Sequence, residues 1–149
     1  MSTQTVAGVM GSLLAAIRAG VPELLEVETV KGQLDPEELK GRLAKLPAAY
    51  IALAGMKDGA RQRVGRTDKS YLLTFALFLV VPARKDGPEP LPLLQKVADL
   101  VGGSAAAYAG PGSQTTFDHM DNLLGADAGR DWIYLYALRW SVSCLVAPQ

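Results

Sequence analysis

The stretch Tyr71–Val81 is apolar at every position except Thr74. Successive side chains of a strand point to opposite sides, so Leu73 would face one way and Leu72 the other. Burial of a large apolar side chain stabilises a fold by roughly 1.5 to 3 kcal/mol. We therefore expect a central strand whose two faces are both covered, either by helices or by another subunit.

The composition indicates one domain. At 149 residues the chain is long enough to bury a core without disulfides or metal, and it carries 15 basic against 15 acidic side chains. This balance disfavours a protein that binds polyanions over its whole surface. The single cysteine, Cys144, excludes an internal disulfide, and a reducing compartment is the simplest match.

Targeting and membrane segments are not expected. The run Val6–Ala19 has no Lys or Arg before it and contains Arg18, so it matches a signal peptide poorly. The apolar runs Tyr71–Val81 and Tyr134–Val146 are too short for a membrane-spanning helix, which needs about 20 residues. We expect a soluble cytoplasmic chain without a membrane partner.

Helical spacing and capping residues predict three helices, which cover Val6–Arg18, a segment beginning at Asp35–Glu38, and Leu91–Val101. Strand patterns cover Leu24–Val30, Ala48–Ala54 and Trp132–Val146, the last being the natural partner of the central strand. Gln114–Leu124 fits either a short strand or a turn of helix. The fold class predicted is α+β, a single domain over residues 1–149, with a mostly antiparallel or mixed sheet flanked by about three helices.

The most polar segment of the chain, Met56–Ser70, separates two apolar strands. Two acidic residues, Asp58 and Asp68, leave it a net charge of +3, because its basic residues are Lys57, Arg61, Arg63, Arg66 and Lys69. A connection of this length exceeds the two to five residues of a usual hairpin loop. It is either a long hairpin that touches a partner or a solvated excursion. It lacks the interleaved aromatic residues that stack on single-stranded nucleic acid, so nucleic-acid binding is not favoured as the main function.

Residues suited to catalysis or metal binding are sparse. No glycine cluster has a phosphate-binding spacing, and His119 is the only histidine. A carboxylate of Asp118 or Asp121 could orient His119 or join it at a metal, and the alternative is a loop histidine beside acidic neighbours. Cys144 lies within an apolar strand, where a thiol behaves as a small hydrophobic group. We expect no catalytic residue, no metal and no cofactor; a small ligand-binding or enzymatic domain that uses His119 is the alternative.

An aromatic stripe runs along one face of the last strand. It consists of Trp132, Tyr134, Tyr136 and Trp140. Such a stripe is either part of the core or a subunit interface, where aromatic residues are enriched.

The order of these segments resembles a known family. Four segments follow one another as in the Gp37-like proteins of Mu-like tailed phages and prophages: Gly32–Leu39, Leu46–Ala49, the polar segment and the strand Tyr71–Val81. Proteins of that family are thought to act as tail terminators, and no catalytic residues of the family exist to carry over.

The resemblance implies a tail-terminator-like α+β subunit that forms a hexameric ring at the head-proximal end of the tail tube. Such a ring stops tube polymerisation and joins the tail to the head. The implied partners are further copies of the chain, the tail tube protein, the sheath if the tail is contractile, and the head-tail connector proteins, with DNA passing near the lumen. The implied location is the virion tail, after assembly in the host cytoplasm. Another head-tail connector or a baseplate protein is the nearest alternative, because a fold does not fix a function.

Overall fold

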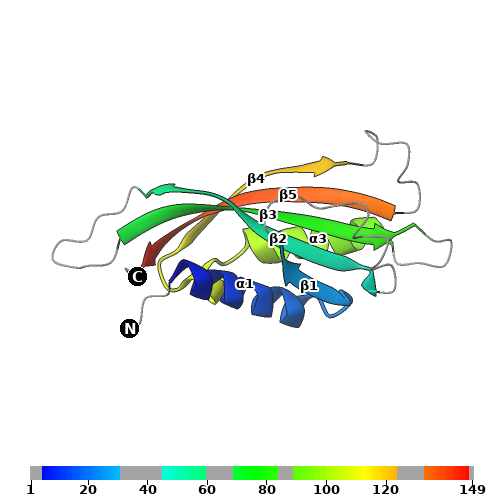
Figure 1. Cartoon of the computed structure of the whole chain (residues 1–149), viewed down its shortest axis with the longest axis horizontal. Coiled ribbons are helices and arrows are strands. Elements are labelled where there is room, and N and C mark those ends of the chain that lie inside the picture. The colour runs from blue at the N-terminus through cyan, green and yellow to red at the C-terminus, as the bar shows by residue number, and fades with distance from the viewer. Residues whose placement is uncertain (1–4, 31–44, 60–68, 84–88, 124–132, 148–149) are drawn as a thin grey trace.

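The computed structural model describes residues 5–30, 45–59, 69–83, 89–123 and 133–147 of the chain. Its elements are arranged as one sheet with helices packed against it (Figure 1). In chain order they are α1 (Val6–Gly20), β1 (Glu26–Thr29), β2 (Ala48–Asp58), β3 (Lys69–Pro82), α3 (Pro90–Gly102), α4 (Ala106–Ala109), β4 (Gln114–Asn122) and β5 (Ile133–Val146).

The sheet is mixed and has the strand order β1-β2-β3-β5-β4. Only the pair β1 and β2 is parallel, while β3 is antiparallel to both β2 and β5, and β4 is antiparallel to β5. The pairing of β3 with β5 runs from Lys69↔Val146 to Pro82↔Ile133. This arrangement confirms the predicted α+β class, the central strand and its partner.

The first helix follows from its capping residue and its apolar spacing. The Thr5 hydroxyl accepts a hydrogen bond from the Gly8 backbone N–H at 3.1 Å, as a helix N-cap does. Val9, Leu13 and Ile17 recur every four residues and are fully buried, so one stripe of α1 packs onto the sheet. The helix ends at Gly20, two residues beyond the predicted end.

The second described helix, α3, begins with Pro90 at its first turn, where a missing N–H costs nothing. It buries Leu93, Leu94, Val97 and Val101. The short helix α4 follows and contacts α1. The sequence predicted α3 but not α4, and the helix expected from Asp35 lies outside the described residues.

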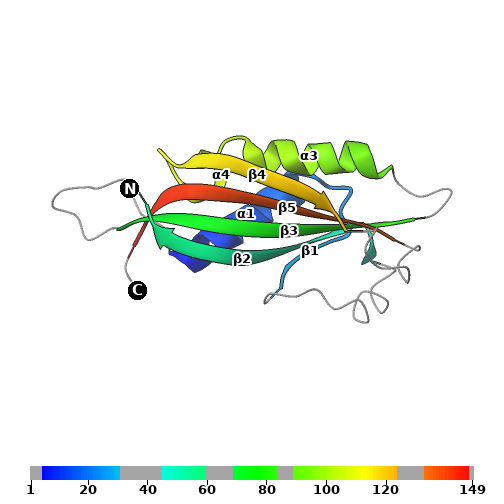
Figure 2. The same cartoon turned by 90° about the horizontal axis from the view of Figure 1, so that it is seen from above.

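The described helices lie on one side of the sheet, which the view from above shows (Figure 2). The core on that side contains Leu73, Phe75, Leu77 and Leu79 of β3. There the rings of Phe75 and Trp140 stack with their centroids 5.6 Å apart. We expected both faces of the central strand to be covered, by helices or by another subunit, and the described helices cover one of them.

The strands are longer than predicted around the basic segment. β2 continues to Asp58 and β3 begins at Lys69, so both ends of the segment predicted as a loop belong to strands. Met56 pairs with Leu73, and Lys57 pairs with Leu72. The hydrogen-bonded ladder between β2 and β3 therefore extends into the segment predicted as a loop. Within the described residues, no helix is long and apolar enough to cross a membrane.

Candidate functional site

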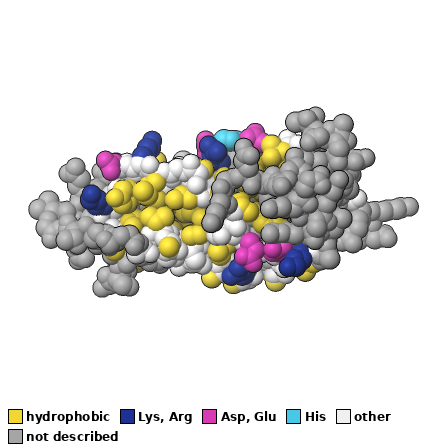
Figure 3. Space-filling model, in the orientation of Figure 1, with side chains coloured by type: hydrophobic (Ala, Val, Ile, Leu, Met, Phe, Trp, Pro, Cys, Tyr) yellow, Lys and Arg dark blue, Asp and Glu magenta, His cyan; other side chains and the backbone are white. Residues whose placement is uncertain are grey.

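The face of the sheet without described helices is the candidate site. Alternation along β3 places Leu72, Thr74, Ala76 and Phe78 on this face, and all four are half-buried. In Figure 3 a band of hydrophobic side chains crosses the face that the strands present in Figure 1, with charged side chains along its margins. The site is therefore a broad surface and not an enclosed pocket.

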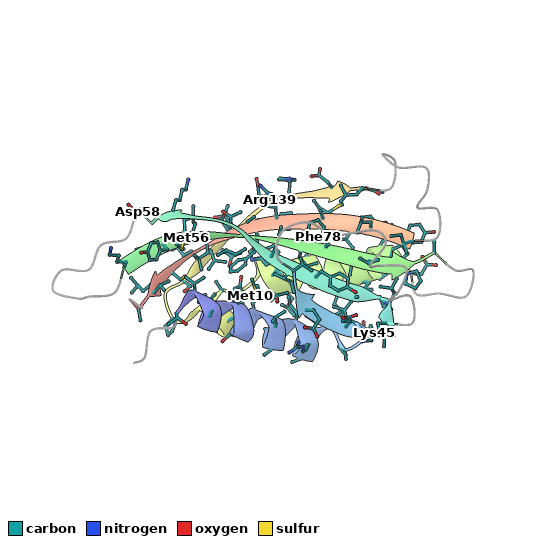
Figure 4. All side chains as sticks on the ribbon, in the orientation of Figure 1. Met10, Lys45, Met56, Asp58, Phe78 and Arg139 are labelled. Carbon is teal, nitrogen blue, oxygen red and sulfur yellow. The ribbon has the colours of Figure 1, made fainter. Side chains whose placement is uncertain are left out.

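One end of this face is fully buried and the rest is half-buried in the described residues. A second buried cluster around Val80 contains Leu46, Ala48, Tyr50, Ile133 and Leu135, and Phe78 packs against its margin. The Tyr50 hydroxyl donates to Glu26 Oε2 at 3.2 Å, which satisfies the phenol beside β1. From Val80 to Phe78 the side chains change from buried to half-buried, and the half-buried stretch continues to Leu72. Phe78 and Met56 lie near different ends of the sheet (Figure 4).

Polar groups line the middle of this face. Thr74 Oγ1 and Ser141 Oγ share a hydrogen bond of 3.2 Å between β3 and β5. The next position along β5 on this face is Arg139, which is exposed and pairs in register with Ala76. Arg139 points outward at the margin of the sheet in Figure 4.

The basic segment supplies two described lysines at the ends of its strands. Lys57 pairs in register with Leu72, and Lys69 pairs with Val146; both lysines are exposed. The predicted contact residues Arg61, Arg63 and Arg66 lie outside the described residues. The structure thus places Lys57 and Lys69 at the base of the predicted contact segment.

His119 lies on the edge strand β4 and not in a loop. Its Nδ1 is 3.0 Å from Asp118 Oδ2 and its Nε2 is 3.2 Å from Asp121 Oδ2, with all three side chains about half-exposed. Each ring nitrogen therefore lies within ion-pair distance of one of the two neighbouring carboxylates. Across the described chain, no group of three His, Cys, Asp or Glu side chains could hold a metal ion.

The aromatic stripe of β5 faces the helices. Trp140 is fully buried and Tyr136 is 5% exposed, while Tyr134 is half-buried against the same core; Trp132 lies outside the described residues. Cys144 is buried in this core as well. The described part of the stripe is core in a single copy of the chain.

A comparison with protein-family models and with curated proteins found no match. The functional interpretation of the chain therefore depends on its own surfaces and on the resemblance in its segment order.

Sequence reasoning missed four exposed apolar side chains at the edges of the sheet. They are Leu53, Met56, Phe117 and Met120. Leu53 and Met56 are three residues apart, and so are Phe117 and Met120. This spacing is the signal that could have found them, because an irregularity in each strand lies between its two apolar residues.

Burial of Tyr108 in the core beside β5 predicts that stability depends on pH. The Tyr108 hydroxyl donates to the Val101 carbonyl at 3.2 Å, and burial raises the pKa of the Tyr108 phenol. A raised folded-state pKa means that stability is fully present below the unfolded pKa of about 10 and is lost as the pH rises above it. We expect the free energy of unfolding to fall at alkaline pH, and to fall less steeply in Tyr108→Phe. Urea unfolding of both proteins between neutral and alkaline pH measures this, and parallel pH profiles would contradict it.

Proposed function

We propose that this chain is a structural subunit of a phage tail: the tail terminator, which forms a ring at the head-proximal end of the tail tube. The ring stops tube polymerisation and joins the tail to the head. The chain acts there as a structural protein and not as an enzyme. Its partners are further copies of itself, six in a ring, together with the tube protein and the connector proteins of the head.

The observation that carries the proposal is the sheet face without described helices. Half-buried apolar side chains from Leu72 to Phe78 lie on it, and a band of hydrophobic side chains crosses it in Figure 3. Contiguous apolar surface of this kind is typical of sites that bind other proteins. The order of segments, which resembles the Gp37-like proteins of Mu-like phages, supports the same function.

The main test is assembly. The purified chain, alone and with tubes grown from the tube protein, is measured by light scattering after size exclusion and imaged by electron microscopy. The proposal expects rings of six at one end of each tube and a fixed tube length. A chain that remains monomeric with tubes present, or one that binds only the end farthest from the head, would contradict it.

The basic segment gives a sharper prediction. Replacing Arg61, Arg63 and Arg66 together with Ala removes three of the positive charges that would contact the tube or lie near DNA in the lumen. We expect the subunit to stay folded but to cap tubes poorly, so that tails become longer and infectivity falls. The matched control is Lys40, Arg42 and Lys45 replaced with Ala, which changes the net charge equally. Normal tail length and infectivity in the first variant would contradict the role of the segment.

A further inference from the structure

Two edges of the sheet have no strand beside them among the described residues. Pairing of β1 with β2 reaches only Ile51, so Ala52–Asp58 has an uncovered outer edge in the described chain. At the opposite side β4 is the last strand, and its outer edge is likewise uncovered by described residues. An edge of this kind presents backbone N–H and C=O groups that another chain can pair with.

Exposed apolar side chains gather on these two edges. Six large hydrophobic side chains are exposed in the described residues, and four of them lie here: Leu53 (38%), Met56 (53%), Phe117 (42%) and Met120 (40%). All four point to the helix-bearing side, because they pair in register with core residues, namely Phe75, Leu73, Trp140 and Leu138. The two edges therefore carry matching apolar surfaces on the same side of the sheet.

The strand directions also match. β2 and β5 are both antiparallel to β3, and β4 is antiparallel to β5, so β2 and β4 run in opposite directions. A second copy in the same orientation would place its β4 antiparallel to β2 and keep the helix-bearing sides together. Antiparallel pairing is the slightly more stable arrangement per residue.

Backbone alternation sets which peptide groups of β2 face outward. The Val30 N–H donates to the Ile51 carbonyl at 2.9 Å, so Ile51 faces the outer edge, and Leu53, two residues on, does as well. Beyond the irregularity after Leu53, the Gly59 N–H donates to the Ser70 carbonyl at 2.9 Å. Gly59 thus faces β3, and alternation turns Met56 outward.

The same reasoning applies to β4. The Leu123 N–H donates to the Leu135 carbonyl at 2.9 Å, so Leu123 faces β5 and alternation turns Met120 outward. The register shift between Phe117 and His119 adds one residue, after which Phe117 also faces outward. Each edge therefore offers outward peptide groups at its two exposed apolar residues, which are three positions apart.

We infer that β4 of one copy pairs antiparallel with Ala52–Asp58 of the next copy, with Met120 opposite Leu53 and Phe117 opposite Met56. The irregularities of the two strands then lie opposite each other. Repeating this head-to-tail contact continues the sheet from copy to copy and generates a ring when the rotation closes. The inference rests on the proposed ring and names the surface through which its subunits bind one another.

Charge disfavours a symmetric contact between two β4 edges. The β4 edge carries Asp118 and Asp121 and no Lys or Arg. Two copies of β4 paired with each other would bring these carboxylates together, which is unfavourable between strands. The head-to-tail contact instead places them against Ala52–Asp58, whose charged residues Lys57 and Asp58 balance, so no edge of like charge meets another.

Cysteine cross-linking of the full chain, in the presence of tubes, tests the register. Residues opposite each other in an antiparallel pair have Cα atoms about 4.5 to 5.5 Å apart, which is within the range that a disulfide spans. Leu53→Cys with Met120→Cys in one chain is expected to give a ladder of covalent oligomers on mild oxidation. Each single variant gives no ladder, and a mixture of the two gives dimers only. The control pair is Leu91→Cys with Met120→Cys, since Leu91 is 65% exposed and lies on α3.

The outcomes separate the interface from the function. Rings on tube ends without cross-links between the cysteines introduced in place of Leu53 and Met120 would overturn the interface and leave the terminator role standing. A ladder without any capping of tubes would support the interface and contradict the terminator role. Dimers formed by Leu53→Cys alone would show a symmetric contact and overturn the inference.

A backbone variant provides an independent test. Proline has no backbone N–H. Because the N–H of Met56 faces outward, Met56→Pro leaves the hydrogen bonds between β2 and β3 intact, as proline does on an edge strand. We expect a folded chain, shown by circular dichroism, that loses its oligomers, whereas Met56→Ala retains part of them. Rings of normal size from folded Met56→Pro would overturn the inference.

Discussion

Leu77→Asp is expected to abolish folding, whereas Ala76→Asp at the neighbouring position leaves the chain folded. Leu77 is fully buried beneath the helices, and Ala76 is on the opposite side of the same strand. A carboxylate buried without a partner costs several kcal/mol even after relaxation, which is comparable with the total stability of about 5 to 15 kcal/mol of a typical domain. Circular dichroism and urea unfolding of the two variants measure the difference.

The control works because of what lies across from Ala76. Arg139 pairs with it in register on the same face, so Ala76→Asp creates an opposite-charge pair, which contributes roughly 0.2 to 1 kcal/mol. Equal destabilisation by both substitutions would mean that the two faces of β3 are equally closed, which contradicts the one-sided arrangement of helices.

The main elements of the fold could be predicted from the sequence where the apolar period is unbroken. The run Tyr71–Val81 and the alternation of Trp132–Val146 led to β3 and β5, and the four-residue spacing of Val9, Leu13 and Ile17 led to α1. These patterns are local, so they identify an element without knowledge of its neighbours. They do not say which face of a strand a helix covers, so the sequence left open whether helices or another subunit would cover each face of β3.

The edge strand β4 could not be predicted in the same way, whereas β1 at the other edge was predicted from its alternation. Gln114–Asn122 is a strand, but the register shift between Phe117 and His119 breaks its period of two. Phe117 and Met120 then face the same side at a spacing of three, which fits neither a regular strand nor a long helix. The shift between Leu53 and Gly55 has the same effect on Leu53 and Met56. The candidate interface was missed because its residues become neighbours only once both irregularities are known.

The predictions about His119 and about the basic arginines depended on single residues, and the structure describes only the first of these sites. The carboxylates beside His119 were identified from the sequence as its neighbours, and the structure places both within 3.2 Å of its ring nitrogens. The same sequence could not tell that the group would be half-exposed on an edge strand. The role of the basic arginines stays a prediction, because they lie outside the described residues.

Trp140→Ala is expected to lower the free energy of unfolding by about 3 to 5 kcal/mol, the usual cost of removing a large aromatic side chain from a core. Trp140 is fully buried, stacks on Phe75 at 5.6 Å and lies on the strand that joins β3 to the edge strand β4. Its loss would leave a cavity between the sheet and the helices that neighbouring side chains fill only in part. Urea unfolding monitored by circular dichroism measures the change.

Two further variants identify the cause of that loss. The buried Trp140 Nε1 makes no hydrogen bond of good geometry with the described residues, so Trp140→Phe keeps most of the ring packing and removes an unsatisfied donor. It should therefore destabilise the fold much less than Trp140→Ala. Leu91→Ala, at an exposed site on α3, should change stability by no more than about 0.5 kcal/mol. Equal losses in Trp140→Phe and Trp140→Ala would show that the indole N–H, and not the packing of the ring against Phe75, is what stabilises this part of the core.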